Sequence, residues 1–416
     1  MIKYKSLKNG LRVVAEEIPY VRSVSAGIWI NVGARMEEGY PSGLAHFIEH
    51  MLFKGTQRRS SKKISNDIDY YGGILNAFTS HDHTCYLVKM PYNHILDGLD
   101  VIGDLLTGSL FLESDIEKEK LVIRDEIKMY EDSPEDYLYE ELMRRTYSNM
   151  GVGRSVLGTI ESINNITRKD ILDFFSSYYL PNNSVLVISG NFVFEDIIDK
   201  IEDIFSEWMP RDFSISRQGQ VFKSQKYIEY RDDEQSNIAM LFPCPNDGNY
   251  KDFLAVKLLN NIIGNSTSSR LFQNIREDRG LTYNIYSSDN FYVGYAELGI
   301  YSSMADENLY QVYKLIIDEI DSLRSNYISQ DELDFAKEQY KGSVLMNLED
   351  TEDRMLMIGE YEVNNKRLLS LEEVLNIIDY IDLDYMKKTI DEIFKNVMSL
   401  GITGRSAKSL LNKIID

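Results

Sequence analysis

Three residues that could bind or serve a metal ion lie within five positions of one another. His46, Glu49 and His50 occur in the apolar run GLAHFIEHMLFKGT, residues 43–56. On a helix, residues four apart lie on one face, so the two imidazoles point the same way and Glu49 lies beside them. A catalytic Zn²⁺ uses such ligands, with one more protein ligand and an open position for water. The order H-x-x-E-H reverses the commoner H-E-x-x-H.

The alternative is that both histidines simply pack against a core, because the residues around them are apolar enough to be buried. The chain has only five histidines, and a buried Glu49 without a partner would be costly. We therefore favour a metal site, and we expect Ser42 to cap its helix.

The remaining protein ligand is expected on a second strong helix, SDIEKEKLVIRDEIKMYE, residues 114–131, which opens with a capping box of Ser114 as N-cap and Glu117 three residues later. Glu119 and Glu126 are seven residues apart and so share nearly the same face. Spacing alone does not choose between them, nor does it exclude Glu117 or Asp125. For most of these carboxylates, solvation on a helix surface is the ordinary interpretation.

Two further histidines, His81 and His83, fall in a polar turn between strand-like runs at 74–79 and 84–90. At i and i+2 they could share one side of a strand and bind a metal. Exposed turn histidines are the better interpretation, and His94 is given no role.

Length and charge restrict the class of protein. With 416 residues and a net charge of −21, two domains are expected, and nucleic acid or anionic membrane is disfavoured as a partner. The charge suits a cavity for basic peptides, or only a solvated acidic surface. Without a membrane-length apolar run or a signal-peptide core, and with only Cys85 and Cys244, we expect a cytoplasmic protein with reduced thiols.

The second half of the chain repeats the first. The strand at 236–243 resembles that at 24–32, and helix–strand units end both halves, at offsets of about 211 and 215 residues. A stretch without periodicity, 209–225, is the predicted linker between domains 1–208 and 226–416.

The repeat does not carry over the metal residues. At the first offset, the places of the two histidines and Glu49 are taken by Lys257, Asn260 and Asn261. The second copy therefore cannot bind zinc in the same way.

A basic segment in the second half, SSRLFQNIREDRGLTYNIYSS (268–288), contains Arg276 and Tyr283. An arginine and a tyrosine could hydrogen-bond a substrate carbonyl or stabilise an oxyanion. From spacing alone, a helix C-terminus followed by Gly280 and a strand is the favoured interpretation.

Together these segments resemble the pitrilysin/insulinase family of zinc peptidases, and especially its roughly half-length members related to mitochondrial processing peptidase and its bacterial homologues. Six segments carry the resemblance in order: the Asn-Gly turn with LRVV, VGARMEEG, GLAHFIEHMLFKGT, LNAFTSHDHTCYL, EKEKLVIRDEI and SSRLFQNIREDRGLTYNIYS.

The resemblance implies roles that spacing left open. It places the third zinc ligand on Glu126, beside His46 and His50, and gives Glu119 an electrostatic role that tunes the ligands. It also makes Arg276 and Tyr283 catalytic.

The family's substrate strand, which pairs with peptides by β-augmentation, matches Asn76, Ala77, Phe78 and Thr79. The sequence departs from the family pattern at Asp82, where glutamate is common, and at 151–154. Both departures could alter substrate preference.

The implied fold is α+β, with two homologous α/β-sandwich domains, each a mixed sheet packed by helices. The implied activity is a zinc endopeptidase with one Zn²⁺ per chain, in which Glu49 is the general base. A half-length chain is expected to form a clamshell homodimer, with Arg276 and Tyr283 acting in trans, or a heterodimer with a related subunit. The alternatives are a non-catalytic peptide-binding or scaffold subunit, which the intact ligands disfavour, and a zinc hydrolase of non-peptide amides, which the substrate strand disfavours.

Overall fold

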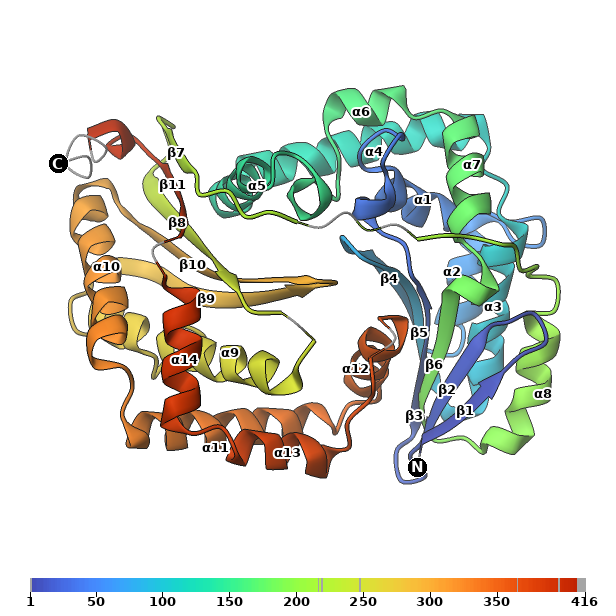
Figure 1. The fold of residues 1–416 in the computed structure, drawn as a ribbon. Helices are drawn as coiled ribbons and strands as arrows, with labels where there is room; N and C mark the ends of the chain where they lie inside the picture. Colours follow the sequence, from blue (N-terminus) through green and yellow to red (C-terminus); the bar gives the residue numbers. More distant parts are fainter. Residues whose placement is uncertain are drawn as a thin grey trace. The chain divides into compact units, whose positions relative to one another are not determined.

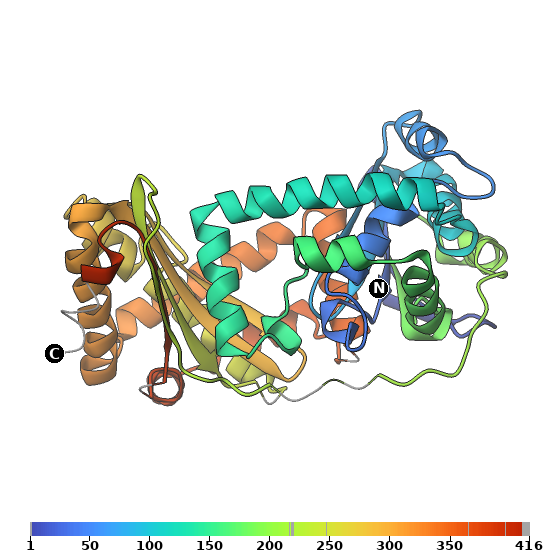
Figure 2. The same ribbon diagram turned by 90° about the horizontal axis from the view of Figure 1, so that it is seen from above.

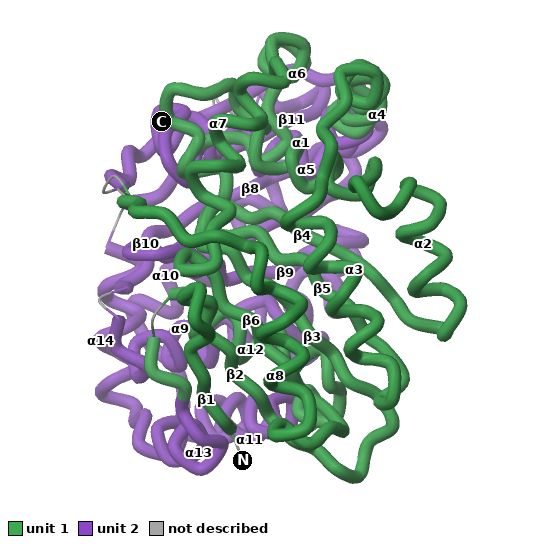
Figure 3. The backbone as a smooth tube through the Cα atoms, turned by 90° about the vertical axis from the view of Figure 1, so that its right-hand side faces the viewer, with its two compact units in different colours: residues 1–127, 154–218, 345–368 green, residues 128–153, 219–344, 369–416 purple. Residues whose placement is uncertain are grey.

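A computed structural model describes residues 2–409 except 216, 218, 219, 247, 365 and 396. Its contacts define two compact units, coloured separately in Figure 3: unit 1 comprises 1–127, 154–218 and 345–368, and unit 2 comprises 128–153, 219–344 and 369–416. The chain passes between units within the predicted linker, but the units are not contiguous. Residues 128–153 belong to unit 2, and 345–368 belong to unit 1.

Unit 1 contains a six-stranded mixed sheet in the order β1-β2-β6-β3-β5-β4. The strands are β1 (Ile2–Ser6), β2 (Arg12–Glu17), β3 (Ser23–Ile30), β4 (Ile74–Thr79), β5 (Thr84–Pro91) and β6 (Ser184–Gly190). Only β2 and β6 pair in parallel, and the other neighbours are antiparallel. Strand β4 is therefore an edge strand, paired with β5 alone.

Helices cover both faces of this sheet (Figure 1). They are η1 (Ala34–Met36), α1 (Leu44–Leu52), α2 (Ser61–Asp69), η2 (Tyr92–His94), α3 (Ile95–Gly108), α4 (Glu113–Asp132), α6 (Ile160–Asn165), α7 (Arg168–Tyr178), η4 (Pro181–Asn183), α8 (Phe194–Ile204) and α12 (Thr351–Val363). Along β3, Val24, Ala26 and Ile28 face the larger core with α1 and α3, whereas Trp29 faces α12. This period of two is the pattern of a strand buried on both faces.

Helix α12 comes from the second half of the chain yet completes the first unit. Its Met355 and Ile358 pack with Trp29, and a Cβ added to Gly359 would lie 2.0 Å from the indole nitrogen. The Arg12 guanidinium donates to the Glu362 carbonyl oxygen at 2.9 Å. Glycine at 359 therefore lets the helix approach the sheet closely.

Unit 2 contains a five-stranded sheet in the order β7-β11-β8-β10-β9. Its strands are β7 (Lys226–Glu229), β8 (Gln235–Cys244), β9 (Thr282–Tyr292), β10 (Tyr295–Ala305) and β11 (Ser399–Thr403). Its helices are α5 (Pro134–Thr146), η3 (Gly151–Gly153), α9 (Tyr250–Ile263), η5 (Phe272–Glu277), η6 (Asp306–Asn308), α10 (Leu309–Asn326), α11 (Gln330–Asn347, which ends in unit 1), α13 (Leu371–Asp379) and α14 (Leu383–Ile393). One face carries α9, α10 and α14, and the other carries α5.

The predicted duplication and fold class are confirmed by the strand order. Strands β2-β6-β3-β5-β4 of unit 1 match β7-β11-β8-β10-β9 of unit 2, with one parallel pair in the same place. In unit 2, Lys257 Nζ lies 2.5 Å from Asp289 Oδ2, and Asn260 Nδ2 donates to Asp289 Oδ1 at 2.5 Å. An internal ion pair thus occupies the region that corresponds to the metal helix.

Helix α4 runs from unit 1 into unit 2, because the boundary lies at residues 127 and 128. It ends at Asp132 and α5 begins at Pro134, so a single residue joins the two helices (Figure 2). The predicted cap Ser114 lies inside α4, which begins one residue earlier. Among the described residues, no helix is both long and apolar enough to cross a membrane.

Candidate metal centre

The segment before α1 fixes the start of this helix in a way that local sequence did not predict. Its N-cap is Gly43, with φ +87°, and no side chain caps it locally. The buried carboxylate of Glu37 accepts hydrogen bonds from the Gly43 and Ala45 amides, at 2.9 and 2.8 Å. The predicted cap, Ser42, was wrong: its hydroxyl donates to the Ser155 carbonyl oxygen. Glu37 takes that place from six residues upstream.

We predict that Glu37→Gln changes the pH dependence of unfolding. Burial raises the pKa of Glu37 from 4.5 to about 8. Between these values the folded protein holds a proton that the unfolded chain releases, so the wild-type free energy of unfolding falls as pH rises. Glutamine removes this contribution to the slope. Because its amide nitrogen cannot accept an N–H, it should also cost about 1–3 kcal/mol below pH 4.5.

Urea unfolding between pH 4.5 and 8, followed by the fluorescence of Trp29 and Trp208, measures this effect, since both tryptophans lie in unit 1. The wild type should be the more stable protein at pH 4.5, the two profiles should cross between about pH 5 and 7, and Glu37→Gln should be the more stable protein at pH 8. Parallel pH profiles would contradict the prediction.

Three side chains from two helices bring their donor atoms together. His46 and His50 lie on α1 and Glu126 lies on α4, and one ligand atom of each lies within 4.8 Å of the others. Glu126 Oε1 is 3.9 Å from His46 Nε2, and its Oε2 is 3.8 Å from His50 Nε2. These are the residues that the resemblance selected, and they all belong to unit 1.

This arrangement fits a zinc ion. The two distances are too long for hydrogen bonds, and tetrahedral ligands about 2.1 Å from an ion lie about 3.4 Å apart. Burial lowers the pKa of His46 to about 3, so its ring is neutral and free to bind a metal. The donor set, two imidazoles and a carboxylate, is that of catalytic zinc sites.

Glu119 and Glu49 flank this group. Glu119 Oε1 lies 2.8 Å from His50 Nδ1, so this carboxylate holds the nitrogen that does not face Glu126. Burial opposes the charge of Glu119, but hydrogen bonds from His50 and Lys54 lower its pKa overall. Glu49 is buried and accepts a hydrogen bond from Thr79 Oγ1 at 2.5 Å, and burial raises its pKa.

The predicted substrate strand is β4. It lies at the sheet edge beside α1, with Asn76 exposed and Ala77, Phe78 and Thr79 half-buried. The Asn76 side chain accepts from the Ala77 amide at 2.9 Å, so a peptide pairing there would compete with this contact. Thr79 connects the strand to Glu49.

Histidines 81 and 83 do not join the metal group. Both are half-buried rather than exposed, because Asp82 between them is held by Arg35 at 2.7 Å and Arg217 at 3.2 Å. Burial lowers the pKa of His83 to about 4. Within the described part of the chain, only His46, His50 and Glu126 form a cluster suited to a metal.

Arg276 and Tyr283 lie in unit 2, on η5 and β9. The guanidinium lies 4.6 Å from the ring centre of Phe272 and 5.3 Å from that of Tyr283. Tyr283 is 78% exposed, so packing in a hydrophobic core does not explain why a tyrosine occurs at this position. The pair forms a preassembled cation–π group within its own unit.

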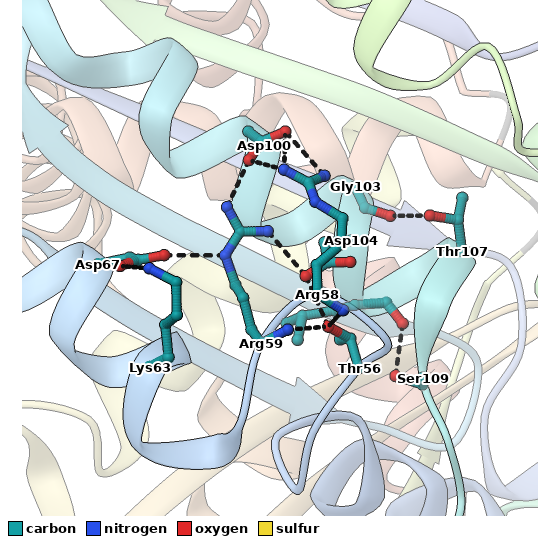
Figure 4. Close-up of polar contacts among 11 residues, drawn as sticks. Thr56, Arg58, Arg59, Lys63, Asp67, Asp100, Gly103, Asp104, Thr107 and Ser109 are labelled. Atoms are coloured by element: carbon teal, nitrogen blue, oxygen red, sulfur yellow. Dashed lines mark hydrogen bonds and ion pairs between the residues drawn. The ribbon is translucent and has the colours of Figure 1, made fainter.

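A cluster of charged residues anchors the loop that follows α1 (Figure 4). Arg59 donates to Asp67, Asp100 and Asp104 at 2.9, 2.5 and 2.7 Å, and Thr56 Oγ1 donates to Asp104 at 2.7 Å. Both Arg59 and Asp104 are buried. The loop is thereby fixed to α2 and α3, which holds the end of the metal helix.

Comparisons with known proteins agree with this geometry. The chain is 34% identical to an uncharacterized zinc protease of Bacillus subtilis, over 98% of this chain and 99% of the relative. The chain belongs to the insulinase family of peptidases. The family model described as Insulinase (Peptidase family M16) matches residues 12–160, and the one described as Peptidase M16 inactive domain matches 165–340.

Other relatives are similar in length. An uncharacterized zinc protease of Streptomyces coelicolor is 31% identical over 97% of this chain and 89% of its own. Among solved structures, a protease from Helicobacter pylori has a TM-score of 0.90 at 22% identity, covering 97% of this chain and 99% of that one. A Pseudomonas fluorescens structure described as a peptidase M16 inactive domain has a TM-score of 0.90 at 19% identity, covering 97% and 98%. At these identities the structures show the fold.

Sequence reasoning did not find Glu37 or Lys54 of this insulinase-family member. Glu37 lies before the loop that precedes α1, so no helical spacing connects it with the α1 amide groups that it binds. Lys54 lies four residues after His50 but two positions beyond the last residue of α1, Leu52, so helical spacing gave no signal for it.

Proposed function

We propose that this protein is a zinc endopeptidase that cleaves unstructured peptides. The observation that carries the proposal is the convergence of His46, His50 and Glu126 beside a buried Glu49 and an edge strand. Kinship with proteins named zinc proteases supports it. In this proposal each chain binds one Zn²⁺ through these three residues.

When bound, zinc would act as a Lewis acid that polarises the scissile carbonyl and lowers the pKa of the bound water. Glu49 then accepts a proton from the attacking water at a carboxylate oxygen and delivers it to the leaving amine. Thr79 Oγ1 holds the other oxygen of Glu49 and fixes the carboxylate's direction. Burial, which raises the pKa of Glu49, favours a group that both takes and returns a proton.

Strand β4 would hold the substrate. An extended peptide pairing with its free edge through main-chain hydrogen bonds would run past Thr79, and so past Glu49. Main-chain pairing favours unfolded peptides over folded proteins and over non-peptide amides.

Incubation of a mixed library of unstructured peptides with the zinc-loaded protein, followed by mass spectrometry, tests the proposal. Cleavage should stop on chelation and return on adding zinc. If the zinc-loaded protein cuts no peptide, the result would support the alternative function, a non-catalytic peptide-binding subunit. The match to the family model described as an inactive domain is compatible with this alternative.

We further propose that Arg276 and Tyr283 complete the site of a second subunit, in a homodimer or a heterodimer with a related chain. Their exposed, preassembled group in unit 2 and the half-length chain motivate this. Mixing inactive Glu49→Gln with inactive Arg276→Ala should restore activity, because the mixed dimer would contain one intact site. Absence of rescue, with subunit exchange confirmed, would exclude sharing in trans.

A further inference from the structure

Each oxygen of the Glu119 carboxylate has a different partner. Oε1 lies 2.8 Å from His50 Nδ1, and Oε2 lies 2.5 Å from Lys54 Nζ. The Glu119 side chain is only 3% exposed. A buried carboxylate is therefore held between an imidazole and an ammonium group.

Lys54 does not behave as an ordinary surface lysine. Its side chain is 34% exposed, yet its ammonium group is directed to a buried carboxylate. Its backbone amide donates to the Met51 carbonyl oxygen at 3.1 Å, and the following loop is anchored through Arg59 and Thr56. The backbone of Lys54 is thus fixed from both sides, unlike a flexible exposed ion pair of small effect.

The positive charge of Lys54 also affects the charge balance of the proposed zinc site. Counted as ionised, Glu49, Glu119 and Glu126 carry three negative charges close to two histidines. Lys54 compensates one of them, and the remaining two equal the charge of one Zn²⁺. Buried charges need such compensation, and partners that hold a ligand from behind alter metal affinity about 10–100-fold.

We propose that Lys54 is a positioning residue of the metal centre, which holds Glu119 so that the His50 ring keeps Nε2 facing Glu126. This inference rests on the proposed zinc site. It extends the site to a residue that touches neither a metal ligand nor the substrate. Lys54 contacts Glu119, and Glu119 in turn contacts His50.

Zinc competition with a chromophoric chelator tests this, using the full chain freed of metal. We expect Lys54→Met to weaken zinc binding about 10-fold, and Lys54→Arg, which keeps the charge, to stay within about threefold of wild type. Lys63→Met is the matched control, because Lys63 pairs with Asp67 on α2 and not with Glu119. It should bind zinc as the wild type does.

A double-mutant cycle separates action through Glu119 from a general effect. In a Glu119→Gln background, Lys54→Met should have no further effect on zinc affinity. The visible spectrum of the cobalt-substituted protein should change in Lys54→Met but not in Lys63→Met, because it reports ligand orientation. Urea unfolding of the apo proteins, followed by tryptophan fluorescence, checks that each variant is folded before zinc is added.

Two results would overturn the inference: wild-type zinc affinity in Lys54→Met, or an equal loss with and without Glu119. If Lys54→Met does not fold, zinc affinity is compared in Lys54→Arg and Glu119→Gln instead. Zinc binding about 10-fold weaker in the charge-preserving Lys54→Arg would also contradict the inference. A wild-type protein that binds no zinc would refute the proposed function itself, which distinguishes the two failures.

Discussion

Replacing Glu49 with glutamine should abolish peptide cleavage while leaving zinc bound. Glutamine has the same shape and its amide oxygen can still accept from Thr79, whose hydroxyl lies 2.5 Å from Glu49. It cannot take a proton from water, and general acid–base catalysis is worth about 10²–10⁴-fold in rate. We expect kcat to fall by this factor with KM little changed.

Steady-state kinetics and metal analysis of the same preparation check this result. Glu117→Gln is the matched control, because Glu117 is an exposed carboxylate on α4 that pairs with Lys120. It should retain wild-type kcat. Turnover of Glu49→Gln near the wild-type level would refute the role of Glu49 as the base.

The second large effect is expected from Glu126→Gln, which should lose zinc itself. Glu126 faces both imidazoles at 3.8 and 3.9 Å, and a neutral amide is a weaker ligand than a carboxylate. Affinity should therefore fall by more than the roughly 10–100-fold typical of residues behind the ligands. Activity should be lost in dilute zinc and return in part in excess zinc.

Asp125→Asn provides a sharp control, since Asp125 is the neighbouring exposed carboxylate on the same helix. Dialysis against a chelator followed by metal analysis should leave zinc in Asp125→Asn but not in Glu126→Gln. The opposite result would move the third ligand to Asp125 and break the proposed assignment.

Local spacing was enough for some features. The i, i+3, i+4 pattern of His46, Glu49 and His50 correctly placed them on one helix, and the strand-like runs predicted at 74–79 and 84–90 are β4 and β5. These segments are short and strongly patterned, so their own residues decide their conformation.

Other features depend on contacts distant in sequence. Glu126 is 76 residues from His50, and only the packing of α4 beside α1 brings the two together, so spacing could not select it over Asp125. The cap predicted at Ser42 failed for a related reason, because Glu37 replaces it. The cap predicted at Ser114 lies inside a helix that starts one residue earlier, at Glu113, and nothing in the structure explains this shift.

The unit boundaries were also beyond local reasoning. No periodicity reveals that α5 packs on the second sheet while α12 packs on the first, because each helix has an apolar face that suits either sheet. This exchange of helices between the two halves of the sequence can be seen only from tertiary contacts, such as the contact of Gly359 with Trp29.

This exchange has a consequence for synthesis of the chain. The sheet of unit 1 is complete in sequence at Gly190, but α12, which covers its second face, ends at Val363. At about 5–20 residues per second, the ribosome needs roughly 10–35 s to add this stretch. During that time the apolar side chains of this face lack their cover: Val14, Trp29, Cys85, Leu87, Val185 and Val187. We therefore expect chaperones to bind the nascent unit 1 on this sheet face until α12 has been made.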